Sequence, residues 1–189
     1  MEKLRAFIHE VAGQVTDSEL AVILTKFRIK RIKKYQYLLR KGQVCSELCF
    51  VKSGCFKVIY PHADREVNVW FAFEEMPITE MQSFVTQSPS QYTIRALENA
   101  EVFAIGYNDL QKLYEEFSSF RFFGMRIVER MLAKSIRRMA SFQFETAEAR
   151  YEKLFDNPDY LNRIPLKDLA SFLGITPNSL SRIRNNTKR

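Results

Sequence analysis

Residues 166–185 read LKDLASFLGITPNSLSRIRN, which is the most specific pattern in the chain. A small residue is followed four positions later by a glycine, and branched apolar residues come six and three positions further on: Ala170, Gly174, Leu180 and Ile183. This spacing is typical of a helix-turn-helix, in which glycine supplies the positive φ of the turn. The stretch therefore predicts two short helices that cross closely at Ala170.

The second of these helices is predicted to begin at Thr176, a good N-cap, with Pro177 at its first helical position. Its outward surface contains no acid, and its side chains are of the kinds that donate to phosphates or read base edges in the major groove. We predict a DNA-binding surface formed by Thr176, Pro177, Asn178, Ser179, Ser181, Arg182, Arg184, Asn185 and Lys188. A helical hairpin that binds a protein is the alternative.

The charge of the 189-residue chain agrees with an anionic partner. It has 29 basic and 22 acidic residues, a formal net charge of +7, and much of the excess lies in residues 28–41 and 163–189. A basic surface attracts nucleic acid, because binding releases the counterions of the phosphates. For residues 28–41 a solvated basic face is the preferred interpretation.

The composition excludes several classes of protein. With 46% hydrophobic and 27% charged residues and no apolar run of about 20, the chain is neither disordered nor membrane-spanning. No secretory signal is visible, so we expect a cytoplasmic protein. Cys45, Cys49 and Cys55 are predicted to be free and buried in strands, and with His9 and His62 they are too few for a metal site. No cofactor is predicted.

The apolar periodicity divides the first part of the chain into helices and strands. Intervals of three and four predict two helices within residues 2–27, the second capped at Thr16-Asp17-Ser18. Short β-prone segments separated by turn residues then predict strands at Ile29–Ile32, Tyr37–Leu39, Leu48–Val51, Phe56–Tyr60, Glu66–Phe73, Tyr92–Ala96 and Val102–Ile105. Many short strands without helices between them indicate an antiparallel sandwich or barrel.

Helices are predicted again beyond this region. Asn108 is expected to cap a short helix through Phe117, and Ser118 or Ser119 a long one that reaches about Phe144. A further helix is predicted at Ala147–Phe155, broken by Asp156-Asn157-Pro158-Asp159.

The long helix carries two apolar stripes. One alternates three and four residues apart, as in a coiled coil, and predicts a dimer interface of Met125, Val128, Leu132, Ser135, Met139 and Phe142. The other is expected to lie on the barrel and consists of Phe120, Phe123, Ile127 and Met131. The alternative is that both stripes are buried within one monomer.

Strands, a long helix and a terminal helix-turn-helix, in this order, resemble the Crp/Fnr family of bacterial transcription regulators. The resemblance also rests on Leu39-Arg40-Lys41-Gly42 with residues 48–58, and on residues 94–102, which are similar to the family's barrel strands. It implies an α+β fold: an N-terminal antiparallel jelly-roll effector domain with flanking helices (1–117), a dimerisation helix (118–145) and a small helix-turn-helix domain (146–189). It further implies a homodimer that reads a pseudo-palindrome in double-stranded DNA, an unidentified small-molecule effector, and RNA polymerase as a partner.

Two features depart from the family pattern. The phosphate-binding cassette has Glu74 in place of a glycine and Ser90 in place of an arginine, so the pocket expected at Phe73, Glu75, Ser90 and Thr93 is predicted not to bind cAMP. The residues after the second helix leave no room for a clear β-hairpin wing, so none is expected. The cysteine cluster of the family's iron–sulfur sensors has no counterpart, and a haem sensor is no better supported.

Two other function classes are alternatives to a DNA-binding regulator. The first is a dimeric small-molecule-binding or protein-interaction module that has lost DNA binding. The second is an enzyme, which is not predicted, because the acids Glu74, Glu75 and Glu80 lack a nucleophile–base partner and are expected in a solvated loop.

Overall fold

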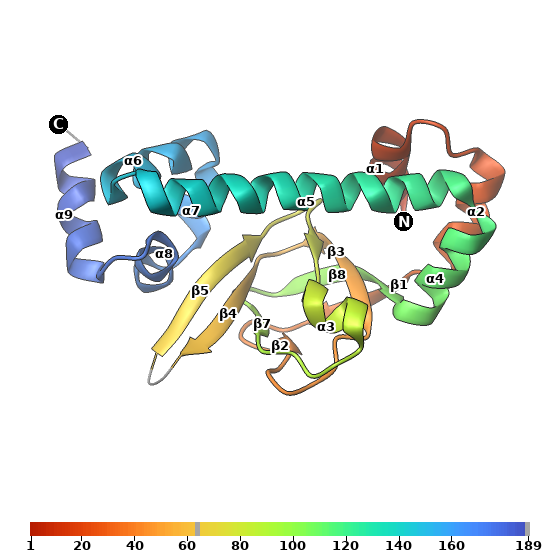
Figure 1. The fold of residues 1–189 in the computed structure, drawn as a ribbon, viewed down its shortest axis with the longest axis horizontal. Helices are drawn as coiled ribbons and strands as arrows, with labels where there is room; N and C mark the ends of the chain where they lie inside the picture. The colour runs from red at the N-terminus through yellow and green to blue at the C-terminus, as the bar shows by residue number, and fades with distance from the viewer. Residues whose placement is uncertain (63–64, 188–189) are drawn as a thin grey trace.

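The computed structural model describes residues 1–62 and 65–187 as two antiparallel sheets covered at one end by helices and joined by a long helix to a helical C-terminal unit (Figure 1). One sheet has the order β1-β8-β3-β6 and the other β2-β7-β4-β5. The strands are β1 (Arg28–Ile32), β2 (Tyr37–Leu39), β3 (Glu47–Ser53), β4 (Phe56–His62), β5 (Arg65–Ala72), β6 (Pro77–Ile78), β7 (Thr93–Ala96) and β8 (Ala100–Gly106). The predicted jelly-roll-like sheet architecture is confirmed.

The alternation of side chains in β7 shows how the sequence sets the register. Ile94 and Ala96 are buried, whereas Thr93 and Arg95 are half-buried, because successive side chains of a strand point to opposite faces. Val58 of β4 lies opposite Ile94 and carries the buried face into the next strand. A slip of one residue would place Arg95 in the core.

Gly54 forms the tight turn between β3 and β4. Its φ is +93°, and a Cβ at this position would lie 2.6 Å from the Cβ of Ala100. Because a side chain meets both a backbone penalty and a collision here, only glycine fits. This turn belongs to the strand-turn-strand motif of residues 48–58.

Four helices surround one end of the sheets and a short one lies beside β6: α1 (Glu2–Ala12), α2 (Asp17–Thr25), α4 (Tyr107–Glu116), α5 (Ser118–Phe144) and α3 (Met81–Thr86). The cap predicted at Thr16 is present as a capping box: its Oγ1 accepts the Glu19 N–H, and the Glu19 carboxylate accepts the Thr16 N–H at 2.8 Å. This box fixes the start of α2.

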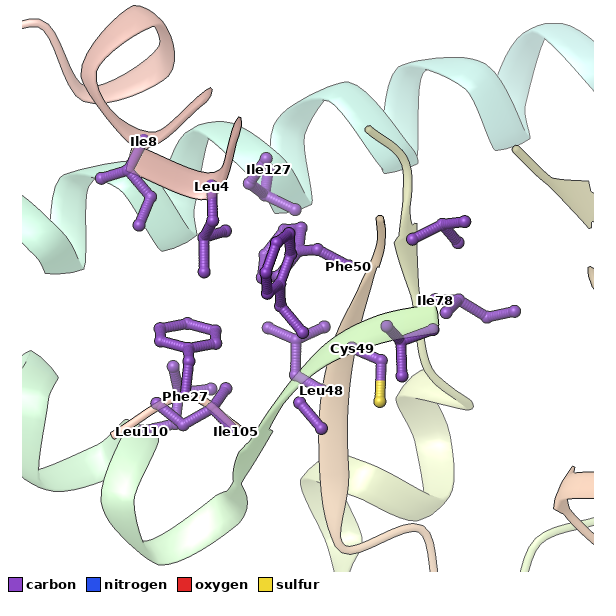
Figure 2. Packing of buried hydrophobic residues seen from close by; sticks show 14 of the residues in the cluster. Leu4, Ile8, Phe27, Leu48, Cys49, Phe50, Ile78, Ile105, Leu110 and Ile127 are labelled. Carbon is purple, nitrogen blue, oxygen red and sulfur yellow. The ribbon is translucent and has the colours of Figure 1, made fainter. Parts of the chain in front are cut away.

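The main core lies between the β3 sheet, α1 and α5, as Figure 2 shows. Phe50 of β3 stands with its ring centroid 5.8 Å from those of Phe7 in α1 and Phe123 in α5. Phe120, Phe123 and Ile127 are all buried, so the prediction that this stripe of the long helix packs on the barrel is confirmed. Burial of such rings supplies much of the stability of a domain of this size.

The C-terminal unit consists of short helices: α6 (Ala147–Glu152), a 3-10 turn (Lys153–Asp156), α7 (Pro158–Arg163), α8 (Leu166–Leu173) and α9 (Pro177–Thr187). The sequence predicts one helix over 147–155, but the α-helix ends at Glu152 and a 3-10 turn follows it. Asn157 caps α7 by accepting the Asp159 N–H, and Pro158 occupies the first turn. The residues predicted to break a helix therefore start one.

Other local predictions also need correction. Asn108 lies inside α4, which follows Gly106, and neither Ser118 nor Ser119 caps α5, since the Ser119 hydroxyl donates to Glu19 instead. The sequence also failed to predict β6 and α3. These elements are short, and α3 begins at an unusual cap, Glu80, which accepts the N–H groups of Gln82 and Ser83.

All three cysteines are free and buried, as expected, but only Cys49 lies within a strand. Burial raises the pKa of Cys49 well above its usual range and that of Cys55 to about 12, so both remain inert thiols at neutral pH.

Candidate nucleic-acid interface and effector cavity

The turn between α8 and α9 has the geometry that the sequence predicts. Gly174 adopts a φ of 74°, and its N–H and that of Ile175 donate to Ser171 and Ala170 carbonyl oxygens at the end of α8. Thr176 Oγ1 accepts the Ser179 N–H at 3.1 Å and so caps α9. Ala170, Leu180 and Ile183 are buried between the two helices.

The outward face of α9 remains in solvent. Six of the predicted residues are exposed: Thr176, Pro177, Asn178, Ser181, Arg182 and Asn185. Ser179 and Arg184 are half-buried, and Lys188 lies outside the described residues. Since residues 177–187 contain no acid, this face carries only amide, hydroxyl and guanidinium groups toward a ligand.

A buried ion pair fixes α8 against β4 and β5. Lys57 Nζ lies 2.8 Å from Asp168 Oδ1, and the lysine side chain is only 3% exposed. Asn68 donates its side-chain N–H to the same carboxylate oxygen at 3.1 Å, and its backbone N–H donates to Ser171 Oγ at 3.0 Å. The hydrogen bonds around the two charges offset the cost of removing them from water.

Aromatic rings continue this contact into the interior. Phe71 lies 5.1 Å from Phe172, and Phe73 lies 5.0 Å from Tyr160, measured between ring centroids. These residues belong to a second core that is shared by the barrel and the C-terminal unit. The helix-turn-helix is therefore held to the barrel of its own chain as well as to α5.

Arg163, the last residue of α7, joins this helix to the barrel, in part through Glu74, which the sequence pattern placed in a solvated loop. Its Nη1 donates to Glu74 at 2.7 Å and to Asp159 at 3.2 Å, and its Nε donates to Glu98 at 3.1 Å. Glu74 also accepts the Gly54 N–H at 2.7 Å. The side chain that replaces the cassette glycine is thus a contact between the barrel and the C-terminal unit.

This contact predicts an acid dependence of stability. Hydrogen bonding to Arg163 lowers the pKa of the Glu74 carboxyl to about 2. The contribution of this carboxylate to the free energy of unfolding is therefore complete above pH 4.5, the ordinary pKa, and declines as the pH falls toward 2. We expect the stability difference between wild type and Arg163→Gln to shrink as the pH falls through this window. Urea unfolding of both proteins at neutral pH and at several acid pH values measures it. A difference that does not change with pH would contradict the assignment.

The predicted dimer stripe on α5 is open in the protomer. Met125, Leu132 and Met139 are 49%, 58% and 60% exposed, and Val128 and Ser135 are also exposed. Phe142 differs, because its ring fills the space beside Gly174, where a Cβ would lie 2.9 Å from Phe142 Cε1. All six stripe residues are therefore exposed in the protomer; Phe142, at 41%, also packs on its own helix-turn-helix, and we call the other five the seam.

Contacts within the protomer engage most of the four residues of the expected effector pocket. Phe73 packs on Tyr160, Ser90 Oγ exchanges hydrogen bonds with the backbone of Tyr92, and Thr93 Oγ1 accepts the Lys41 N–H at 3.1 Å. Glu75 occupies a turn with a φ of 64°. Three of the four are thus engaged in packing or backbone contacts within the barrel and its interfaces.

A large cavity lies between the barrel and α5. It measures about 730 Å³ and is bounded by Trp70 and Tyr92 of the barrel side and by Met131, Arg138 and Met139 of α5. We call this space the barrel cavity. Its volume falls in the range of small-molecule sites. On α5 it is lined by Met131 of the barrel-facing stripe, by Ser135 and Met139 of the predicted dimer stripe, and by Arg138.

Within residues 1–62 and 65–187, no group of three His, Cys, Asp or Glu side chains is placed to hold a metal ion. No described helix is long and apolar enough to cross a membrane.

Comparison with known proteins agrees with this architecture. Residues 29–117 match the family model described as the cyclic nucleotide-binding domain, which places such a domain in this part of the chain. The fold is also similar to those of solved transcription regulators. FixK2 from Bradyrhizobium japonicum superposes with a TM-score of 0.76 at 13% identity, covering 86% of this chain and 84% of its own.

Two further structures share the fold. The c-di-GMP responsive global regulator CLP from Xanthomonas campestris has a TM-score of 0.69 at 18% identity and covers 92% of both chains. A protein from Eubacterium rectale described as a transcriptional regulator of the Crp/Fnr family has a TM-score of 0.69 at 13% identity, covering 93% of this chain and 85% of its own. No curated protein matches the sequence.

Proposed function

We propose that this protein is a transcription regulator that binds double-stranded DNA as a homodimer through α9. The observation that carries the proposal is the exposed, acid-free face of α9, on a helix whose opposite side is anchored by Leu180 and Ile183. Such a helix can enter a major groove with its N-terminal residues on base edges. The role is one of binding rather than catalysis.

The seam on α5 supports the homodimer. An apolar stripe with the spacing of a coiled coil is costly in water unless a second helix covers it, and a copy of the same helix matches it by symmetry. Two α9 helices presented in this way would read a pseudo-palindromic site.

Loss of Arg182 is expected to weaken the specific complex. Arg182 is exposed on α9, and an arginine that reads a base contributes about 1–3 kcal/mol of discrimination. We expect Arg182→Ala to reduce affinity for the selected site by this amount, as measured by fluorescence anisotropy, while Arg121→Ala, at the far end of α5, leaves it unchanged. Equal affinity of Arg182→Ala and wild type would remove α9 from the interface.

The target site for that measurement comes from selection. Random duplex DNA incubated with the protein at two salt concentrations should yield a two-fold related motif, with binding that weakens as salt rises. Failure to enrich any motif at the lower salt would favour the alternative, a dimeric ligand-binding or protein-interaction module that has lost DNA binding.

The barrel cavity is proposed to take an effector other than cAMP. Ser90, which stands in place of the cassette arginine, is not among the lining residues of this cavity, and Arg138, the one cation among the described lining residues, donates to the Phe172 carbonyl oxygen at 2.9 Å. A cyclic phosphate would therefore lack the charged hydrogen bond that the cassette arginine supplies in the family pattern. We expect calorimetric titration with cAMP to show no binding, and a micromolar dissociation constant would contradict this.

A further inference from the structure

A second cleft, which we call the hinge cleft, lies between the C-terminal half of α5 and the C-terminal unit. Its volume is about 420 Å³. Its walls come from β5, α5, α6, the 3-10 turn, α7 and α8, and they include Trp70, Phe142, Tyr160 and Phe172. The barrel cavity shares only Trp70 and Arg138 with it. Its size suits a small molecule, and its rings suit a flat one.

The hinge cleft is lined by basic side chains, most of which form no ion pair; Arg150 also lies near Glu145, whose backbone carbonyl accepts its Nη1 N–H at 2.6 Å. Lys134, Arg137, Arg138 and Arg150 make no ion pair with any carboxylate in the described part of the chain. Lys153 also lines the cleft, but it is neutralised by Glu145. One acid, Asp156, is among the lining residues. The described wall therefore carries an excess of positive charge.

Packing explains two of these cations in part. Arg138 Nη2 donates to the Phe172 carbonyl at 2.9 Å and Arg150 Nη2 to that of Leu173 at 3.0 Å, where the end of α8 favours positive charge. The buried Nε of Arg150 still has no acceptor among the described residues. Burial also lowers the pKa of Arg138 to about 10, and its guanidinium lies over the Phe172 ring at 3.7 Å from the centroid.

The remaining two cations lie on a face of α5 that is apolar elsewhere. Each residue advances a helix by about 100°, so Lys134 and Arg137 follow Phe123 and Ile127 on the side turned away from the seam. In its first half this side packs into the core; in its second half it presents ammonium and guanidinium groups to the hinge cleft. None of the five seam residues lines the cleft; of the predicted dimer stripe, Phe142 alone is among the described lining residues.

We propose that the hinge cleft binds a small organic anion with a flat apolar body. Its acidic group is held by Lys134, Arg137 and Arg150, and its body lies against the aromatic wall of Trp70, Phe142 and Tyr160. Cations supply charge-assisted hydrogen bonds to phosphate, sulfonate or carboxylate, and aromatic faces accept a flat ring system. The site does not depend on DNA binding by α9.

Binding of two fluorescent probes to the full chain tests this site. Anilinonaphthalene sulfonate has the anionic group and flat rings that the cleft requires, and phenylnaphthylamine has the same rings without the sulfonate. We expect Lys134→Gln/Arg137→Gln to weaken sulfonate binding at least about tenfold, the loss of one charged hydrogen bond, and to change phenylnaphthylamine binding less than about twofold. Pyrophosphate should displace the sulfonate from wild type.

The matched control is Arg121→Gln/Arg126→Gln, which removes two charges from the other end of α5, outside the hinge cleft. It should bind the sulfonate as wild type does. The proposal is overturned if wild type does not bind the sulfonate, if the Lys134→Gln/Arg137→Gln variant retains wild-type affinity, or if both double variants weaken binding equally. Lys134 and Arg137 are exposed, so their replacement leaves the core intact.

Discussion

Leu132→Glu/Met139→Glu is expected to make the protein monomeric and to lower its affinity for a two-fold related DNA site by about a hundredfold to ten-thousandfold. Both side chains lie in the exposed seam of α5, where a partner helix would bury two carboxylates without counterions. A monomer binds each half-site independently and loses the effective concentration that linkage provides. Because the seam is exposed in the protomer, the variant should still fold.

Sedimentation equilibrium measures the mass, circular dichroism checks the fold, and anisotropy with the selected duplex measures affinity. Ala133→Glu/Ala140→Glu is the matched control, since these residues are also exposed, are also seven apart, and lie one position around the helix outside the seam. It should remain dimeric and bind DNA. A dimeric Leu132→Glu/Met139→Glu protein would show that the subunits associate elsewhere.

The second large effect concerns the attachment of α8 to the barrel. We expect Asp168→Ala to destabilise the protein by about 3 kcal/mol, because it leaves the buried Lys57 ammonium with only the half-exposed Glu66, 3.3 Å away, as a charged partner. Lys57→Met/Asp168→Leu should recover most of this loss, since apolar side chains of similar volume need no counterion.

Urea unfolding of the two variants and wild type gives these values. Glu129→Ala serves as the control, because the exposed Arg126–Glu129 pair should contribute less than about 0.5 kcal/mol. If Asp168→Ala unfolds with the same midpoint as wild type, the ion pair does not hold the C-terminal unit on the barrel. If Lys57→Met/Asp168→Leu is less stable than Asp168→Ala, the hydrogen bonds of Asn68 contribute more to the free energy of unfolding than the ion pair does.

Much of the architecture could be predicted from local signals. The turn at Gly174 and the cap at Thr176 each depend on residues within four positions, so the helix-turn-helix was recognisable in the sequence. The order Asn157-Pro158 carries the same cap-then-proline signal as Thr176-Pro177, yet the sequence pattern predicts a break there because the helix that follows is only six residues long. A short helix or strand contains too few repeats of its apolar pattern for the periodicity to be recognised.

The contacts between distant segments could not be predicted in this way. Lys57 and Asp168 are 111 positions apart, and Glu74 and Arg163 are 89 apart, so neither pair has a local pattern. The composition of the cassette indicated that Glu74 would repel a phosphate, but only the fold shows that the carboxylate meets Arg163. The barrel cavity has no local sequence pattern for the same reason, because α5 supplies one of its walls.

The uninterrupted course of α5 also limits how the chain can tolerate insertions. From Ser118 to Phe144 it connects the barrel, the seam and the helix-turn-helix. One inserted residue within α5 would rotate the C-terminal unit by about 100° about the helix axis and shift it by about 1.5 Å. The two α9 helices of a dimer would then no longer face the same DNA duplex. Length variation among close relatives should therefore accumulate in surface turns, while the span between these two residues keeps its count.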